Sequence, residues 1–383
     1  MALHFAPSEF AARLARLQAE MQRQRFDAMF LFAQESMYWL TGYDSFGFCF
    51  FQCLVVRADG SLTLLTRSAD LRQARQTSLI KDIRIWKDAR DADPSADLKT
   101  LASELGLAGK RIGVEYETQG LTHRNGRRLE SAFAGFAQLE EVSTLVPALR
   151  AVKSAAEIAY VRQAAELSDK ADAAAIALLG AGAEEGDILG AMHDAIFRAG
   201  GDYPANEFII GSGADALLCR YKSGRRKLDR NDQLTLEFAG VWRHYHAALM
   251  RTHIVGEPHK LHIPYHAAAR EALLGCEAEL RPGRSAGDVF AAHARMLDQH
   301  GLGAHRLNAC GYSLGAKFTP SWMDPPMFYE ANDFQLVPGM TMFLHMILMD
   351  SDSATAMCLG RTSLIGESAS EPVNGKSLDL VIR

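Results

Sequence analysis

Apolar positions in the first 150 residues alternate between helical and strand-like spacing. Four apolar residues recur every three or four positions and predict an amphipathic helix over residues 8–25: Phe10, Leu14, Leu17 and Met21. A second helix is predicted over about residues 97–105. Apolar runs predict strands over residues 28–32, 48–56, 62–66 and 111–116. This alternation indicates a mixed α/β layer structure.

The pattern changes near residue 150, where a capping box predicts the start of a long helix. The side chains of Ser154 and Glu157 can each satisfy a backbone N–H at that terminus. Further helices are predicted over residues 187–198, 264–280 and 285–300. Long strands are predicted over residues 208–211, 234–238, 244–255, 340–349 and 359–365. The polar tail after Glu367 is expected to fray. We therefore predict two domains, residues 1–150 and 151–383.

The composition is that of an ordinary globular protein, with 48% apolar and 23% charged residues. A formal net charge of −5 gives no general basic field to attract nucleic acid. The short basic run at residues 222–226 is predicted to be a solvated turn. The six cysteines include no C-x-x-C pair, which argues against a zinc ribbon or a disulfide framework and favours a reducing cytoplasm. No apolar run is long enough to span a bilayer.

Several motifs resemble the creatinase and aminopeptidase P family, and the resemblance extends over essentially the whole chain. They are Arg150-x-x-Lys153-Ser154-x-x-Glu157, Tyr245-x-x-Ala248-x-x-Arg251-Thr252, the Gly-Tyr-Ser-Leu-Gly segment at 311–315 and the Val-Pro-Gly-Met segment at 337–340. The resemblance implies an N-terminal mixed α/β domain and a C-terminal pita-bread catalytic domain. Such a domain is a curved antiparallel sheet with flanking helices. A homodimer is implied as well.

Metallopeptidases of this family hold two divalent ions with two aspartates, one histidine and two glutamates. Carried over position by position, these ligands fall on Glu237, Ala248, Tyr312 and His345, and near Leu359. Only Glu237 keeps a carboxylate. A lone histidine and a tyrosine, which ligates rarely, do not complete the oxygen-rich cage that hard cations prefer. The sequence therefore predicts no metal and no other cofactor.

Ectoine hydrolase and creatinase belong to the same family and hydrolyse a non-peptide C–N bond of a small charged solute without its metals. The segments that resemble ectoine hydrolase are residues 37–44, 200–205, 237–252, and 311–315 together with 320–322. Arg220 is a departure, because those relatives have a histidine acid or base at this position. Arginine stays protonated near neutral pH. We therefore predict that Arg220 binds a substrate carboxylate in bidentate fashion.

Hydrolysis of a C–N bond needs an activated water and a proton donor for the leaving nitrogen. Glu237, on a buried strand, is a candidate general base with a pKa raised by desolvation. Binding of a substrate cation and an ion pair with an arginine in the sheet are the alternatives for Glu237. His246 and His345 are candidates for proton transfer, because imidazole titrates near neutrality. An ordinary structural role stays open for each histidine.

Other residues are candidates for contact with the substrate. Strand alternation places His244 and His246 on the same face as Ala248, a position that the family turns toward its pocket. The Tyr312 hydroxyl can donate to an anion or a leaving group. The remaining candidates are the cations Arg220 and Arg251, of which Arg251 is the weaker, and an aromatic wall of Trp39, Tyr43 and Trp322.

The sequence thus predicts a cytoplasmic, metal-independent hydrolase of a non-peptide C–N bond in a small charged nitrogenous solute, ectoine-like or creatine-like. The alternatives are a proline-specific metallopeptidase with atypical ligands, a lyase, and a non-catalytic small-molecule binder on the same fold. The expected partners are a small-molecule substrate and a second copy of the chain, with no nucleic acid and no membrane.

Overall fold

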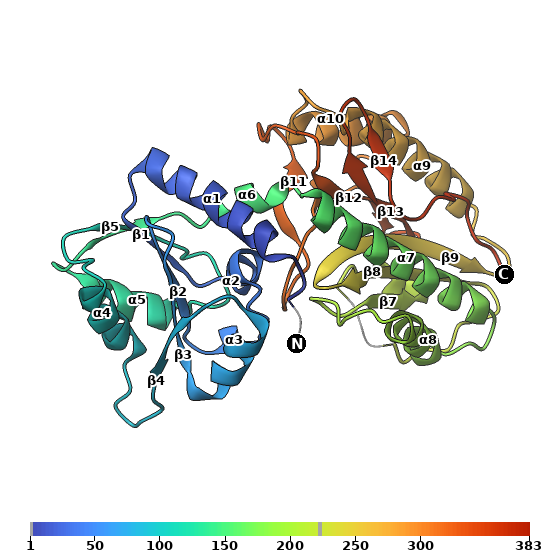
Figure 1. Ribbon diagram of the computed structural model, residues 1–383. Coiled ribbons are helices and arrows are strands. Elements are labelled where there is room, and N and C mark those ends of the chain that lie inside the picture. The colour runs from blue at the N-terminus through green and yellow to red at the C-terminus, as the bar shows by residue number, and fades with distance from the viewer. Residues whose placement is uncertain (1–2, 221–223) are drawn as a thin grey trace. The chain divides into compact units, whose positions relative to one another are not determined.

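The computed structural model describes residues 3–220 and 224–383. The chain divides into two compact units, Met1–Arg150 and Ala151–Arg383 (Figure 1). Both are mixtures of helices and strands, and the second contains an antiparallel sheet, which confirms the predicted fold class. Within the described residues no helix is both long enough and apolar enough to cross a membrane.

The N-terminal unit is a mixed sheet covered by helices on both faces. Its described strands lie in the order β4-β3-β2-β1-β5-β6. The strands are β1 (Ala28–Leu31), β2 (Cys53–Arg57), β3 (Leu62–Arg67), β4 (Asp82–Trp86), β5 (Arg111–Val114) and β6 (Gln138–Glu141). The helices are α1 (Pro7–Gln24), α2 (Gln34–Thr41), α3 (Leu71–Thr77), α4 (Pro94–Glu104), α5 (His123–Phe133) and α6 (Leu145–Ala151). Apolar residues of α1, α2 and α3 fill the core on one face, and those of α4 and α5 fill the core on the other.

Most predicted elements of this unit are confirmed, with two corrections. The strand predicted over residues 48–56 is shorter, because a 3-10 turn (Gly47–Cys49) precedes β2. Helices α2, α3, α5 and α6 and strands β4 and β6 were not predicted. In α2 nearly all residues are buried and no amphipathic spacing marks the helix. The buried Glu115 carboxylate accepts hydrogen bonds from the backbone N–H groups of Phe32 and Ala33, just before α2, and so fixes where this helix begins.

The C-terminal unit is built on a larger antiparallel sheet. Its described strands lie in the order β11-β10-β12-β13-β9-β8-β7, with β14 paired to β13. They are β7 (Ile209–Ser212), β8 (Asp232–Trp242), β9 (Tyr245–Val255), β10 (Ala309–Ser313), β11 (Asp324–Tyr329), β12 (Thr341–Asp350), β13 (Thr355–Ile365) and β14 (Ser370–Pro372). The helices are α7 (Ala155–Leu178), α8 (Glu185–Arg198), α9 (His262–Glu279) and α10 (Ala286–Gln299). Helix α7 packs on β8 and β9, whereas α9 packs on β12 and β13 (Figure 1).

Local signals at the start of this unit are confirmed, but the prediction for its tail is wrong. The Ser154 hydroxyl accepts from the Glu157 N–H at 3.2 Å, and the Glu157 carboxylate accepts from the Ser154 N–H at 2.9 Å, as a capping box requires. The tail does not fray. Asn374 is fully buried and donates to the Ser168 hydroxyl at 2.8 Å and to the Ala248 carbonyl at 3.1 Å. Asn374 therefore ties this part of the tail to the core through internal hydrogen bonds.

Close packing of α7 on β8 makes Gly240 irreplaceable. A Cβ at this position would lie 2.0 Å from the Ala164 carbonyl oxygen. We expect Gly240→Ala to destabilise the protein by about 2 kcal/mol or more, since backbone must move to relieve this clash. The measurement is chemical unfolding. Gly190→Ala is the control, because Gly190 lies in α8 with open space around it and should gain stability slightly. Equal effects of the two substitutions would contradict this packing.

Candidate active site

A chain of three hydrogen-bonded side chains forms the centre of the candidate site. The Trp322 indole N–H donates to the Tyr312 hydroxyl oxygen at 2.9 Å, and the Tyr312 hydroxyl donates to Glu237 Oε1 at 3.1 Å. Trp322 and Tyr312 are buried, whereas Glu237 is half-buried. Because the Tyr312 oxygen accepts from Trp322, its proton is directed at the carboxylate.

These contacts depend on the curvature of the sheet. Tyr312 lies in β10 and Glu237 in β8, and three strands, β12, β13 and β9, separate them. Four inter-strand spacings amount to about 19 Å in a flat sheet, farther than two side chains can reach. The 3.1 Å hydrogen bond therefore requires the sheet to curl around the site.

Burial controls the protonation of Glu237. Desolvation raises the pKa of its carboxyl to about 7, while the Tyr312 hydrogen bond and the positive charge of Arg220 act in the opposite direction. Glu237 Oε2 accepts no hydrogen bond from any described residue, so this oxygen is available to a water or a substrate. A carboxyl that titrates near neutrality with one free oxygen can act as a general base.

His345 and Arg220 belong to the same cluster. The His345 ring, on β12, lies 5.7 Å from the Tyr312 ring. Its Nδ1 is buried and has no hydrogen-bond partner among the described residues. Burial lowers the pKa of His345 to about 4, so the imidazole is neutral at pH 7. The exposed Arg220 acts electrostatically on Glu237, Tyr312 and His345, which places its charge at the same centre.

The two histidines predicted to face the pocket from residues 244 and 246 have other partners. His246 is fully buried; its Nε2 accepts from the Ala205 N–H at 3.0 Å, and its Nδ1 lies 3.4 Å from the Gly315 carbonyl oxygen. Both nitrogens are thus occupied by backbone. His244 is not part of β9, because it forms the two-residue hairpin turn with Arg243, both at positive φ. Its ring stacks on Phe318. These contacts favour structural roles for both.

Arg251, Trp39 and Tyr43 also have internal contacts. The Arg251 guanidinium is buried and donates to the backbone carbonyls of Met250 and Gly360. Trp39 and Tyr43 have no exposed surface within the N-terminal unit. Their burial favours core packing over contact with a solute. Of the predicted residues, the structure brings together Glu237, Tyr312, Trp322, His345 and Arg220.

Sequence reasoning missed two residues that support the site. Asn206 Oδ1 accepts from the Trp322 backbone N–H at 3.2 Å and fixes the loop that carries the indole. The buried Lys153 amine donates to the Ala151 carbonyl at 2.9 Å and to the Ser313 hydroxyl at 3.3 Å, next to Tyr312. The only signal for Lys153 was its place in a family motif, and Asn206 gave no signal.

Comparison with known families identifies the fold. Residues 159–366 match the model of metallopeptidase family M24, and residues 13–152 match that of the creatinase/prolidase N-terminal domain. The chain belongs to metallopeptidase family M24. Membership confirms the predicted family and the predicted enzyme class, a hydrolase. The "uncharacterized hydrolase/peptidase y4tM" of Sinorhizobium fredii is 26% identical, covering 100% of this chain and 99% of the relative.

Two further proteins that this chain resembles have different printed activities. The ectoine hydrolase of Halomonas elongata is 25% identical over 89% of this chain and 89% of its own. A prolidase from Thermococcus sibiricus has the same fold, with a TM-score of 0.88, 18% identity and coverage of 98% of this chain and 99% of that one. The second likeness concerns the fold alone.

The positions onto which the family resemblance carries the M24 metal ligands do not fit a dinuclear centre. Ala248 and Leu359, the residue near the last of these positions, are buried and have no donor atom in their side chains. Tyr312 donates its proton to Glu237 and receives one from Trp322. No group of three or more His, Cys, Asp or Glu residues among the described residues is arranged to hold a metal ion. We therefore derive no catalytic step from a bound metal.

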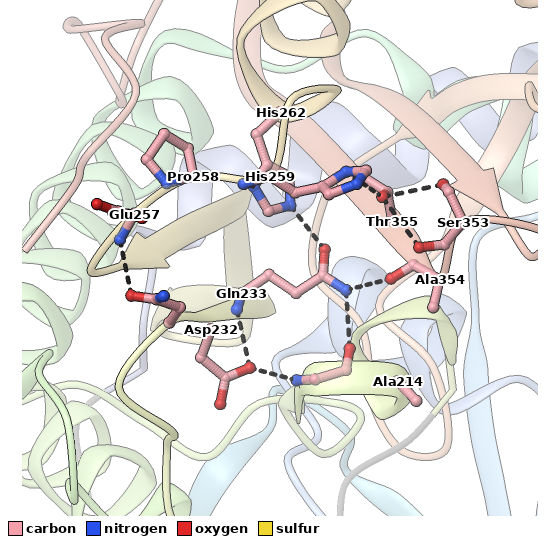
Figure 2. A pocket seen from close by; sticks show the side chains of 12 residues that line it. Ala214, Asp232, Gln233, Glu257, Pro258, His259, His262, Ser353, Ala354 and Thr355 are labelled. Carbon is pink, nitrogen blue, oxygen red and sulfur yellow. Dashed lines mark hydrogen bonds between the residues drawn. The ribbon is translucent and has the colours of Figure 1, made fainter.

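Two hollows of solute size lie elsewhere in this unit. One, of about 500 Å³, contains none of the residues predicted for the site (Figure 2). Gln233 links its walls by donating to the carbonyls of Gly213 and Ala354 and accepting from His262. The side-chain amide of Gln233 is thus fully used within the wall of this hollow. The other, of about 490 Å³, is lined in part by Ala205 and Asn206, which contact His246 and Trp322.

From the raised pKa of Glu237 we predict how the stability of the folded protein depends on pH. The carboxyl ionises near its ordinary value of 4.5 in the unfolded chain but only near 7 in the folded protein. Ionisation therefore destabilises the folded state above pH 4.5, and the effect grows until about pH 7. We expect Glu237→Gln to raise Tm more at pH 8 than at pH 4.5, by about 2 °C or more. Calorimetry at both pH values measures this.

The control for that experiment is Glu166→Gln, because Glu166 lies on the exposed side of α7. Its Tm change should be small at both pH values. A Glu237→Gln effect that is independent of pH would contradict the burial of an ionisable carboxyl at this position.

Proposed function

We propose that this chain hydrolyses a non-peptide C–N bond in a small charged nitrogenous solute, and that Glu237 is its general base. The observation that carries the proposal is the Tyr312–Glu237 hydrogen bond, at the place where the family has metal ligands. The carboxyl with a pKa near 7 supplies proton chemistry there. The similarity to an ectoine hydrolase supports the class of bond.

The proposed reaction uses the free oxygen of the base. Ionised Glu237 takes a proton from water through Oε2 while Tyr312 holds Oε1. The water oxygen bonds to the substrate carbon, the C–N bond breaks, and the proton passes to the leaving nitrogen. His345 is neutral and is the second candidate for proton transfer. The exposed Arg220 binds the substrate carboxylate and favours the ionised base.

A proline-specific metallopeptidase is the second candidate, favoured by the M24 family match. Its chemistry needs two metal ions, and Ala248, onto which the resemblance carries one ligand, has no donor atom in its side chain. We expect the purified protein, offered manganese, zinc and iron, to retain well below one equivalent of metal after mild chelation, as measured by elemental analysis. About two retained equivalents would favour the metallopeptidase. A homodimer remains a prediction from the family resemblance, and a cytoplasmic location remains a prediction from the cysteine usage.

A solute screen tests the hydrolase directly. We expect turnover of at least one member of a panel of ectoines, creatine analogues and N-acyl amino acids. Glu237→Gln should lower kcat by about 10²-fold or more, the usual effect of losing a general base. Retained turnover in this variant would remove Glu237 from the mechanism. Glu166→Gln serves as the matched control.

Labelled water separates the remaining alternatives. Hydrolysis in H₂¹⁸O incorporates ¹⁸O into the product, whereas a lyase releases product without the label. A non-catalytic binder gives calorimetric binding and no product. Mass spectrometry of the reaction mixture distinguishes all three outcomes.

A further inference from the structure

One hollow of the C-terminal unit has the size and the lining of a small-molecule site. It is the hollow of about 490 Å³ that contains Ala205 and Asn206, and we call it the α8 hollow. Helix α8, the segment 203–208 and the loop at residues 319–320 form its walls. The walls are mostly apolar, with side chains such as Leu189, Phe208 and Pro320. Ligand pockets are commonly of this size, mainly apolar, and supplied with a few polar groups that orient the ligand.

His193, on α8, is a polar group that can orient a ligand in this hollow. Its side chain is half-buried and forms no hydrogen bond or ion pair with any described residue. The ring stacks on Phe208, with 4.3 Å between centroids and 7° between planes, and is also nearly parallel to the Phe197 ring. Burial lowers the pKa of His193, so the imidazole is neutral at pH 7 and has one donor and one acceptor nitrogen. Stacking fixes the ring plane and with it the directions of these two groups.

Two exposed residues define the chemistry of a suitable ligand. Tyr203 lines the hollow and is 80% exposed, and its ring lies 4.8 Å from the Phe197 ring. A flat ligand ring would remove this aromatic surface from water. Glu207 also lines the hollow, and its negative charge disfavours an anion there. The lining therefore suits an aromatic ring that carries a positive charge and a hydrogen-bonding group.

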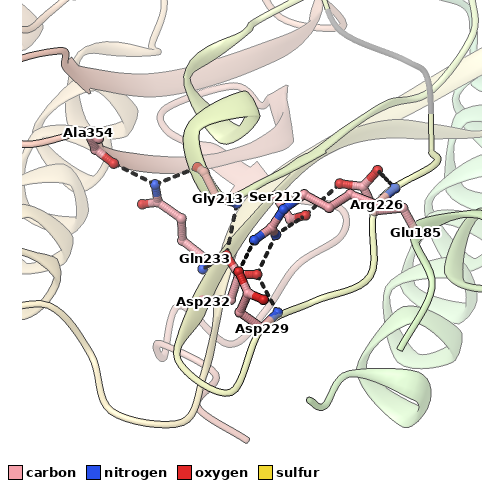
Figure 3. A network of polar contacts seen from close by, with 8 residues as sticks. All are labelled: Glu185, Ser212, Gly213, Arg226, Asp229, Asp232, Gln233 and Ala354. Atoms are coloured by element: carbon pink, nitrogen blue, oxygen red, sulfur yellow. Dashed lines mark hydrogen bonds and ion pairs between the residues drawn. The ribbon is translucent and has the colours of Figure 1, made fainter. Parts of the chain in front are cut away.

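The walls of the hollow are held in place by buried contacts. Glu185, the first residue of α8, has no exposed surface; it accepts from the Ser212 hydroxyl at 2.6 Å and from the Arg226 N–H at 3.0 Å (Figure 3). The segment 203–208 is fixed as well, because the Ala205 N–H donates to the His246 ring at 3.0 Å. Walls that are already in place reduce the entropy lost when a ligand binds.

The contacts of Arg226 also correct the prediction for the basic run at residues 222–226. That run was predicted to be a solvated turn, but Arg226 is half-buried and paired. Its guanidinium binds the buried Asp232 and donates to the Ser212 hydroxyl at 2.7 Å (Figure 3). Residues 222 and 223 of the run lie outside the described residues.

We infer that the α8 hollow binds a cationic aromatic amine, whose ring packs on Tyr203 and whose ring N–H donates to His193. Glu207 provides the charge complementary to the ammonium group. The lining residues of the hollow do not include Glu237, Tyr312 or His345 within the described part of the chain. Binding there is therefore independent of the proposed function, and its failure would leave the proposed hydrolysis untouched.

Isothermal titration calorimetry of the full-length protein with tryptamine tests the site. We expect a Kd of about 1 mM or below. Indole-3-acetate has the same ring with a negative charge, and it should bind about tenfold more weakly or worse. His193→Phe keeps a ring on Phe208 but removes both nitrogens, and Tyr203→Ala removes the exposed ring. Each variant should raise the Kd for tryptamine about fivefold, the usual effect of losing one such contact.

The control is Tyr329→Ala, because Tyr329 is also an exposed tyrosine of this unit but lies on β11, outside the hollow. Its Kd for tryptamine should equal that of the unchanged protein. Absence of binding, or equal affinities in all three variants, would overturn the inference. Sedimentation velocity covers the other possible occupant, a second copy of the chain. If Tyr203→Ala dissociates a dimer and tryptamine does not bind, the hollow is an interface between copies and the inference is wrong.

Discussion

The hydrogen bond from Tyr312 to Glu237 is the contact on which the candidate site depends. It joins β10 to β8 across three intervening strands, so it exists only because the sheet curls. Partial burial of this carboxyl raises its pKa toward neutrality. Trp322 orients the tyrosine, and Asn206 holds the loop of the tryptophan. The position of the candidate base and the direction of the Tyr312 proton therefore both depend on the curvature of the sheet.

Charge balance fits the residues that stand at the positions onto which the family resemblance carries the other M24 ligands. Several carboxylates buried together repel one another, and without cations they cannot all ionise. Here Ala248, Tyr312, His345 and the position near Leu359 carry no negative charge at neutral pH, because Tyr312 stays protonated and His345 is neutral. The one carboxylate that remains, Glu237, has Arg220 as its neighbouring cation. Among the described residues, the negative charge of Glu237 is therefore balanced by the positive charge of Arg220.

Local sequence signals predicted many of the elements, although not β10, which carries Tyr312, whereas long-range partners could not be predicted. The Ser154 capping box depends on residues three apart, and it formed as expected. His246 was expected to face the pocket by strand alternation, but its partners are Ala205 and Gly315, far along the chain. His244 was misplaced because alternation fails at the residue where a hairpin turns. Glu237 could be found from a family motif. Its hydrogen bond to Tyr312 could not be predicted, because it forms only when the sheet curls and brings β10 close to β8.

The two sides of the site are held by different means, and their chemistry explains the difference. A general base must keep its geometry to a fraction of an ångström, and Glu237 lies in the middle of a long strand covered by α7. A cation that binds a substrate carboxylate must instead admit and release its ligand, and Arg220 is exposed on a connecting segment.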